Sequence, residues 1–264
     1  MPIQEKCQVL DHKKVGPKHY QLILSSPYIS SHAEPGQFVN IRCSESCDPL
    51  LRRPLSLHRI SKGHKTFELL YEAVGKGTEL LTKYFVGEEI NALGPLGEGF
   101  KINPQKQIAI IVGGGMGVAP LLALAEAIKD KIKAIYVLIG AKSRGLVLCE
   151  EDFKKTTDQI LLATDDGSYG KKGLVSDILL DFLNDRLGTR DSGLATIYAC
   201  GPKPMLRAIS EIAFQKKIDC QISMEERMAC GIGACKGCAI KTKNGYKMVC
   251  KDGPVFEAKE ILWK

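Results

Sequence analysis

The first hundred residues alternate short apolar runs with turn signals. Runs of strand length include QVLDHKKV, HYQLILSS, QFVNIRC, LSLHRI and TFELLYEAV, and Glu89 to Leu93 forms another. Pro35-Gly36 and the segment from Gly94 to Gly97 are turn signals that punctuate these runs. The pattern predicts a small antiparallel β-barrel, an all-β domain that we place at residues 1–103.

The pattern of apolar and polar residues changes at Gln107, where apolar runs of strand length begin to alternate with helical patterns. QIAIIV, AIYVLIG, QILLAT and ATIYAC have the length of strands, and helices are expected near residues 120–130 and 174–183. Strands that alternate with helices favour a parallel sheet with right-handed crossovers, so we predict an α/β domain at residues 104–220. The segment 221–264 contains little that could form a core alone, and we predict a small third domain there.

Composition and charge narrow the class of protein. The chain has 264 residues, of which 44% are hydrophobic and 25% charged, as is ordinary for globular proteins. The net charge is +7, but the lysines are spread along the chain, so nucleic-acid binding is not indicated. The start has no apolar core of signal-peptide length, and the apolar runs are too short to span a bilayer. We therefore expect a soluble cytoplasmic protein without membrane association.

The strongest chemical signal is a cluster of four of the ten cysteines near the C-terminus: Cys230, Cys235, Cys238 and Cys250. Their C-x4-C-x2-C…C spacing is that of the ligands of plant-type [2Fe–2S] clusters. Interleaved glycines allow a loop to fold tightly around such a core: Gly231, Gly233 and Gly237. The alternative is a structural zinc site, but zinc ribbons favour two C-x2-C pairs and only one is present.

The second signal is a glycine-rich turn directly after the strand-like run QIAIIV. Its candidate binding residues are Gly113, Gly114, Gly115, Gly117 and Pro120. Such a strand-to-helix turn lets a dinucleotide pyrophosphate approach the backbone and lie at the positive end of a helix. The full fingerprint is absent, because Ala119 or Pro120 replaces the third glycine and AIYVLIG ends without an acid. The alternative is a tight turn with no ligand.

Three further segments carry weaker signals. Arg53-Pro54-Leu55-Ser56 begins a strand and Gly75-Lys76-Gly77-Thr78 precedes a short helical pattern, so each could contact a phosphate or be only a turn. Cys200-Gly201-Pro202 follows the last strand of the predicted sheet, at the edge where ligands of open α/β sheets bind. The alternative for Cys200 is a buried structural cysteine.

Taken in order, PGQFVNIR, RRPLSL, GKGT, GGGMGVAPL, TDDGS, CGP and the terminal cysteines resemble the ferredoxin reductase superfamily over nearly the whole chain. RRPLS with GKGT, and MEERMACGIGACKGC with Cys250, are similar to the electron-transfer subunits of NAD-dependent (class B) dihydroorotate dehydrogenases. The resemblance implies an FAD-binding barrel, an NAD-binding domain and a C-terminal cluster domain, which agrees with the three domains predicted above.

The resemblance also implies residue roles. FAD contacts would come from Arg53, Pro54, Leu55, Ser56, Leu70, Tyr71, Glu72, Gly77 and Thr78. NAD contacts would come from the glycine-rich turn and from Asp165, Asp166, Gly201 and Pro202, with Cys200 near the nicotinamide. Leu55 departs from the commonest superfamily pattern, which has an aromatic residue there to shield the flavin. The two aspartates favour NAD(H) over NADP(H), while Lys142 and Arg144 argue the other way.

The function implied by the resemblance is electron transfer in pyrimidine biosynthesis. Dihydroorotate would be oxidised at an FMN in a separate catalytic subunit, and electrons would pass through the [2Fe–2S] cluster and FAD to NAD+, with no residue here needed as a general acid or base. The complex would be a heterotetramer with two copies of each subunit. The alternatives are a related NAD(P)H-oxidoreductase subunit that serves ferredoxin, hydrogenase or sulfide chemistry, and a redox-sensing module without enzymatic activity.

Apolar residues beside the cysteines favour docking of a partner onto the C-terminal region. These residues are Met224, Met228, Ile232 and Ala234. A small domain could hardly bury them alone, and exposed apolar patches mark interfaces. The alternative is that they pack against the chain's own domains.

Overall fold

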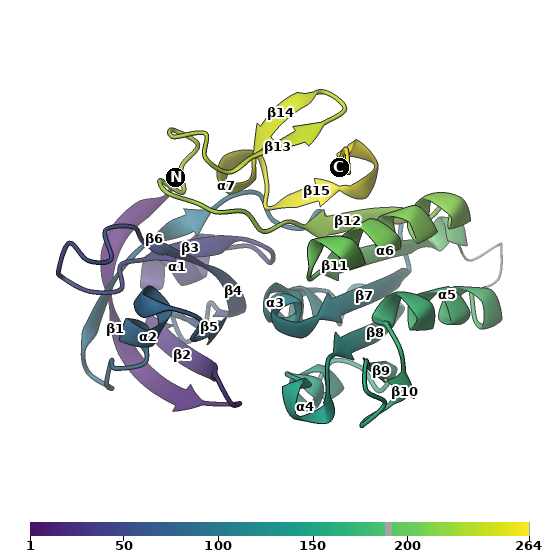
Figure 1. Ribbon diagram of the computed structural model, residues 1–264, viewed down its shortest axis with the longest axis horizontal. Helices are drawn as coiled ribbons and strands as arrows, with labels where there is room; N and C mark the ends of the chain where they lie inside the picture. The colour runs from purple at the N-terminus through teal and green to yellow at the C-terminus, as the bar shows by residue number, and fades with distance from the viewer. Residues whose placement is uncertain (188–191, 264) are drawn as a thin grey trace.

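The computed structural model describes residues 1–187 and 192–263, and it confirms the predicted fold class. The N-terminal part is a closed six-stranded antiparallel barrel (Figure 1), with strand order β1-β2-β5-β4-β3-β6. Its elements are β1 (Ile3–Lys14), β2 (His19–Ser25), α1 (Pro27–His32), β3 (Phe38–Ile41), β4 (Arg53–Ser61), β5 (Thr66–Glu72), α2 (Lys76–Leu81) and β6 (Glu89–Leu96).

The barrel interior follows from the two-residue period of its strands. Val39 and Ile41 of β3, and Phe67, Leu69 and Tyr71 of β5, point inward and are almost fully buried. One turn prediction was wrong, because β6 continues through the Gly94 to Gly97 signal as far as Leu96. The proline there is tolerated because the register between β3 and β6 shifts beside it, and proline is found at such irregularities.

The second part is an α/β domain built on a seven-stranded sheet of order β10-β9-β8-β7-β11-β12-β15. Its strands are β7 (Ile108–Gly114), β8 (Ala134–Ala141), β9 (Ile160–Thr164), β10 (Lys171–Lys172), β11 (Ala195–Cys200), β12 (Asp219–Ser223) and β15 (Val255–Glu257). The helical segments are η1 (Gly115–Val118), α3 (Ala119–Ile128), η2 (Arg144–Leu146), α4 (Glu150–Lys154), α5 (Val175–Asp185), η3 (Ser192–Leu194) and α6 (Lys203–Lys216). Residues of α5 and α6 pack in one core cluster and residues of α3 and α4 in another, so helices cover both faces of the sheet.

The C-terminal region contains β13 (Ala239–Thr242), β14 (Gly245–Met248), α7 (Val249–Asp252) and η4 (Ala258–Glu260). It is joined to the rest of the chain in two ways. β15 pairs antiparallel with β12 and extends the large sheet by one strand. Cys238, Val249 and Cys250 also share a core cluster with Phe38 and Leu96 of the barrel. The region that carries the cysteines therefore packs against both other parts (Figure 1).

The barrel and the α/β domain meet through β4 and α3. The Arg59 guanidinium contacts the carboxylates of Glu126 at 2.7 Å, Asp152 at 3.1 Å and Glu68 at 3.1 Å. The neighbouring His58 is buried, and its Nδ1 donates to the Ala119 carbonyl at 2.8 Å. Because a carbonyl oxygen only accepts, this contact requires the tautomer with a proton on Nδ1. Within the described residues, no helix is both long and apolar enough to cross a membrane.

Candidate functional site

The glycine-rich turn lies where the order of the parallel sheet reverses. The chain proceeds from β7 through β8 to β9 on one side, and from β11 to β12 on the other. In open α/β sheets this reversal, at the carboxyl ends of the strands, is where ligands bind. Gly115 follows β7 with φ +54°, and a side chain there would meet no atom within 4 Å. The turn therefore presents open backbone at the expected ligand position.

The turn also packs closely against the end of β11. A Cβ on Gly117 would lie 2.1 Å from the Cys200 carbonyl oxygen, and one on Gly114 would lie 2.4 Å from the Met205 sulfur. Only glycine fits at position 117, where the obstacle is backbone, whereas a side chain at position 114 would require the flexible Met205 side chain to move. The packing brings the turn together with Cys200, Gly201 and Pro202, as the two strand ends predict.

Cys200 is half-buried at the end of β11. Burial raises the pKa of its thiol to about 12, although a hydrogen bond with Ser223 partly offsets this. The thiol is therefore protonated at neutral pH and is not an activated nucleophile. Its position beside the nicotinamide stays a prediction.

Asp165 and Asp166 are exposed and follow β9 directly. Asp166 accepts hydrogen bonds from the backbone N–H of Ser168 at 2.9 Å and from its hydroxyl at 2.6 Å, which lowers the pKa of this carboxyl. The Arg144 guanidinium lies over the Tyr169 ring, 5.2 Å from its centre. The hydrogen bonds from Ser168 thus favour the ionised form of Asp166, and the nearby Arg144 has Tyr169 as its aromatic partner.

Arg53, Gly77 and Thr78 converge from β4 and α2. A Cβ on Gly77 would lie 2.6 Å from Nε of Arg53, so the guanidinium rests on the backbone of α2. The Thr78 hydroxyl accepts from the Val74 backbone N–H at 3.0 Å. Two segments that the sequence separates are thus close enough to bind one phosphate group.

The other proposed flavin contacts face in different directions. Leu70 is buried against the core of the α/β domain, so it lies between the two domains. Tyr71 points into the barrel, where its hydroxyl is 2.9 Å from Nε2 of His12. A contact between Tyr71 and a flavin outside the barrel would therefore be made by its backbone. Pro54, Leu55, Ser56 and Glu72 are all half-buried, and Leu55 packs on the barrel core.

Backbone amides of the C-terminal loop point at the sulfurs of the four cysteines. Gly233 donates to Cys250 at 3.1 Å, Cys235 to Cys230 at 3.4 Å, and Cys250 to Cys238 at 3.4 Å. Ile232 and Gly237 add contacts of 3.5 Å to Cys230 and Cys235. Amides directed at sulfur stabilise thiolates and the negative charge of an iron–sulfur core. The loop thus fits the donor set that such a cluster requires.

The four thiols are arranged as two pairs, since side-chain hydrogen bonds join Cys230 with Cys235 and Cys238 with Cys250. Burial raises the pKa of Cys230, but the amides of Cys235 and Ile232 outweigh it and lower the pKa to about 6. Across the described ranges, no three His, Cys, Asp or Glu side chains converge as ligands of one metal ion. Two pairs of thiols suit two irons better than a single zinc.

Exposure differs across this loop. Cys238 and Cys250 are buried, whereas Cys235 is exposed beside Ile232, whose side chain is 50% exposed. The expectation of a four-residue apolar surface was wrong for the two methionines. Met224 is buried and Met228 packs against the same core, because the loop lies on the barrel and the large sheet. The accessible apolar surface reduces to Ile232 and Ala234.

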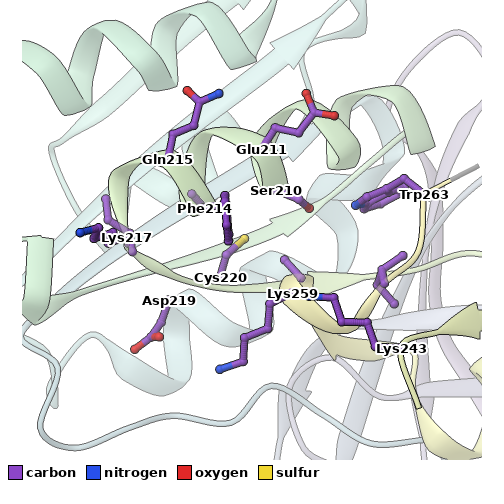
Figure 2. Close-up of a pocket in the computed structure, with 14 residues that line it drawn as sticks. Ser210, Glu211, Phe214, Gln215, Lys217, Asp219, Cys220, Lys243, Lys259 and Trp263 are labelled. Carbon is purple, nitrogen blue, oxygen red and sulfur yellow. The ribbon is translucent and has the colours of Figure 1, made fainter. Parts of the chain in front are cut away.

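A groove of about 540 Å³ lies elsewhere, between α6, β12 and the last residues of the chain (Figure 2). Phe214, Lys217, Cys220 and Trp263 line it, together with Lys243 from the turn after β13. None of its lining residues is a candidate cofactor ligand. The groove is therefore not assigned to any of the candidate cofactor sites.

Sequence reasoning missed three residues that the fold places between these sites: Asn40, His58 and Arg59. The partners of Arg59 lie 67 and 93 residues away in α3 and α4, and no local pattern connects them. In the sequence, Asn40 is distinguished only as a polar residue between the apolar Val39 and Ile41, and this pattern does not indicate what its side chain faces.

Comparison with known proteins agrees with this geometry. Residues 225–262 match the iron-sulfur cluster binding domain of dihydroorotate dehydrogenase B, and residues 111–211 match the oxidoreductase NAD-binding domain. The solved structure of an NADH-dependent reduced ferredoxin-NADP oxidoreductase is similar, with a TM-score of 0.85 and 30% identity over 97% of this chain and 90% of that one.

Two curated relatives match along their whole length. The dihydroorotate dehydrogenase B (NAD(+)) electron transfer subunit of Geobacillus sp. (strain WCH70) is 40% identical, and that of Desulforamulus reducens is 36% identical. Each match covers 98% of both chains. The chain therefore belongs to the family of dihydroorotate dehydrogenase B (NAD(+)) electron transfer subunits.

Proposed function

We propose that this chain passes electrons from dihydroorotate, oxidised at an FMN in a catalytic partner subunit, through a [2Fe–2S] cluster and FAD to NAD+. Oxidation to orotate releases two electrons and two protons. NAD+ takes up both electrons and one proton as a hydride, and the other proton enters solvent. The observation that carries the proposal is the pairing of four thiols under directed amides, in a chain related over its whole length to electron-transfer subunits.

Each part of the chain has a distinct task. We assign residues 1–103 to flavin binding, 104–220 to NAD binding and 221–264 to the cluster. The two family matches, at 111–211 and 225–262, fall within the second and third segments. When bound, FAD exchanges a hydride with nicotinamide and single electrons with the cluster, which carries one electron at a time.

The chain's own residues hold and orient these groups. Cys230, Cys235, Cys238 and Cys250 bind the two irons as two pairs. Arg53 and Thr78 bind the flavin pyrophosphate, because the Arg53 guanidinium rests on the backbone of Gly77 and Thr78 is the next residue of α2. The remaining contacts are from Pro54, Leu55, Ser56, Leu70, Tyr71 and Glu72.

The glycine-rich turn binds the NAD pyrophosphate through its backbone. Gly115 has open space beside it for this approach, whereas Gly113, Gly114 and Gly117 allow the turn to pack closely on the chain's own atoms. Pro120 lies in the first turn of α3. Asp165 and Asp166 accept from the adenosine ribose and disfavour a 2′-phosphate, which selects NAD(H). Gly201, Pro202 and Cys200 border the nicotinamide. No side chain in this arrangement acts as a general acid or base.

The partner is an FMN-containing catalytic subunit, and the complex is a heterotetramer of two copies of each. The exposed Cys235, Ile232 and Ala234 bring one cysteine pair to the surface, where an electron can leave for a second protein. All ten cysteines are free, as suits the reducing cytoplasm.

Reconstitution tests the proposal. The isolated chain, purified anaerobically, is expected to contain about two irons and two sulfides. It should reduce dyes with NADH but not oxidise dihydroorotate. Addition of the catalytic subunit should give dihydroorotate-dependent reduction of NAD+. If the mixture does not couple these reactions while ferredoxin supports turnover, the chain serves the alternative chemistry of its structural neighbour.

A further inference from the structure

Asn40 is a buried polar residue without a partner. Its side chain is 0% exposed, and neither amide atom has a hydrogen-bond partner among the described residues. A buried amide left unpaired is destabilising, and native structures rarely contain one without a reason. The other residue in this condition, His19, lies in β2, three positions from β3 in the barrel order. The two therefore have separate explanations.

Asn40 lies on the outer face of the barrel. Val39 and Ile41 point into the barrel core, so Asn40 between them points outward. In the register between β3 and β4, Asn40 pairs with Pro54, and Phe38 pairs with Ser56. Paired residues of antiparallel strands lie on one face. Asn40 thus shares its face with two residues of the proposed flavin strand.

The cluster loop covers this face. Gly231 follows Cys230 directly, and its φ of +74° is a conformation that glycine adopts readily. A Cβ on Gly231 would lie 2.5 Å from Nδ2 of Asn40 and 3.4 Å from a methyl group of Leu96. Any side chain at 231 would displace the amide. The loop therefore rests on the Asn40 nitrogen, one residue from a proposed iron ligand, without bonding to it.

We propose that Asn40 is a positioning residue for the iron–sulfur cluster, whose side-chain N–H donates a hydrogen bond to a sulfur of the cluster bound at Cys230. The inference rests on the proposed function of the four cysteines. A sulfur acceptor next to Gly231 satisfies the amide, and the glycine permits the approach. Since the reduced cluster carries more negative charge, this bond stabilises the reduced form and raises its potential. It also anchors the loop to the strand beside the proposed flavin site.

Two substitutions in the full chain test this role. Asn40→Leu keeps the approximate shape and removes the donor, while Asn40→Asp keeps the shape and replaces the N–H₂ with a charged acceptor. Both should shift the g values of the reduced cluster in electron paramagnetic resonance and make its midpoint potential more negative, Asp more so than Leu. The apoprotein of Asn40→Leu should melt no lower than wild type, because it loses an unpaired buried amide.

Asn91→Ala serves as the matched control. Asn91 lies on the neighbouring strand β6, and its amide oxygen already accepts from Arg52 at 2.6 Å. This variant should retain the wild-type spectrum and potential.

The outcomes separate this inference from the function on which it rests. Wild-type protein without iron and sulfide would contradict the proposed function itself. A full cluster in Asn40→Leu, with unchanged spectrum and potential, would overturn only the role of Asn40. A change confined to FAD affinity or flavin potential would also overturn it, since Asn40 would then face the flavin.

Discussion

Replacement of Gly117 by alanine tests whether the glycine-rich turn and the end of β11 form one NAD site. The added Cβ would lie 2.1 Å from the Cys200 carbonyl oxygen and 2.6 Å from the Gly201 nitrogen. Carbon–oxygen contacts settle near about 3.3 Å, so η1 and β11 must separate by about 1 Å. Both obstacles are backbone atoms, which cannot move aside as a flexible side chain can.

A displacement of this size at the binding position can lower the rate by about 100-fold. We expect kcat/KM for NADH in dye reduction to fall by about that factor, equivalent to about 2.7 kcal/mol. Overpacking should also lower the free energy of unfolding by about 1–3 kcal/mol. FAD content and the cluster spectrum should not change, because neither of those sites includes η1.

Gly87→Ala is the matched control for stability. Gly87 has φ +95° and open space around it, so alanine there adds backbone strain of about 1–2 kcal/mol outside the turn. Its kinetics with NADH should match wild type. If Gly117→Ala reduces dyes with NADH within twofold of wild type, the close approach does not shape an NAD site and the reasoning fails.

Four other predictions concern the remaining sites. Cys230→Ser should lose the cluster absorbance and the iron, whereas Cys43→Ser in the barrel core should keep both. Arg53→Ala removes a charge-assisted hydrogen bond of about 1.5–3 kcal/mol, so the Kd for FAD in equilibrium dialysis should rise about tenfold or more, and full FAD retention would contradict the assignment. Wild type should show a higher kcat/KM with NADH than with NADPH, and Asp166→Asn should narrow that ratio; a preference for NADPH would overturn the reading. Burial lowers the pKa of His58, so at pH values below about 6.5 the unfolded chain binds a proton at this residue while the folded chain does not. The free energy of unfolding should therefore decrease as the pH is lowered through this range. Urea unfolding of His58→Asn between pH 5.5 and 8 should lack this component, and an unchanged pH profile would refute it.

Local patterns were sufficient for the fold class, and they pointed to the four cysteines as candidate cluster ligands. Alternation in the barrel and helical spacing after Gln107 record which faces are buried, and burial is what selects the elements. The spacing from Cys230 to Cys250 is the spacing expected of a short loop that reaches around two irons. The glycine-rich turn was visible for the same reason, since close backbone approach excludes side chains within one short segment.

Contacts between distant segments were decided only by the tertiary structure. The carbonyl that a side chain at position 117 would meet belongs to Cys200, and the amide beside Gly231 belongs to Asn40. β15 completes the sheet of another domain, and Met224 and Met228 are covered by residues far away in the chain. The periodicity of apolar residues in the sequence indicates that a residue is buried, but it does not indicate which residues it packs against. The sequence therefore determined which groups the chain offers to its cofactors, and the packing of the three parts determined how those groups meet.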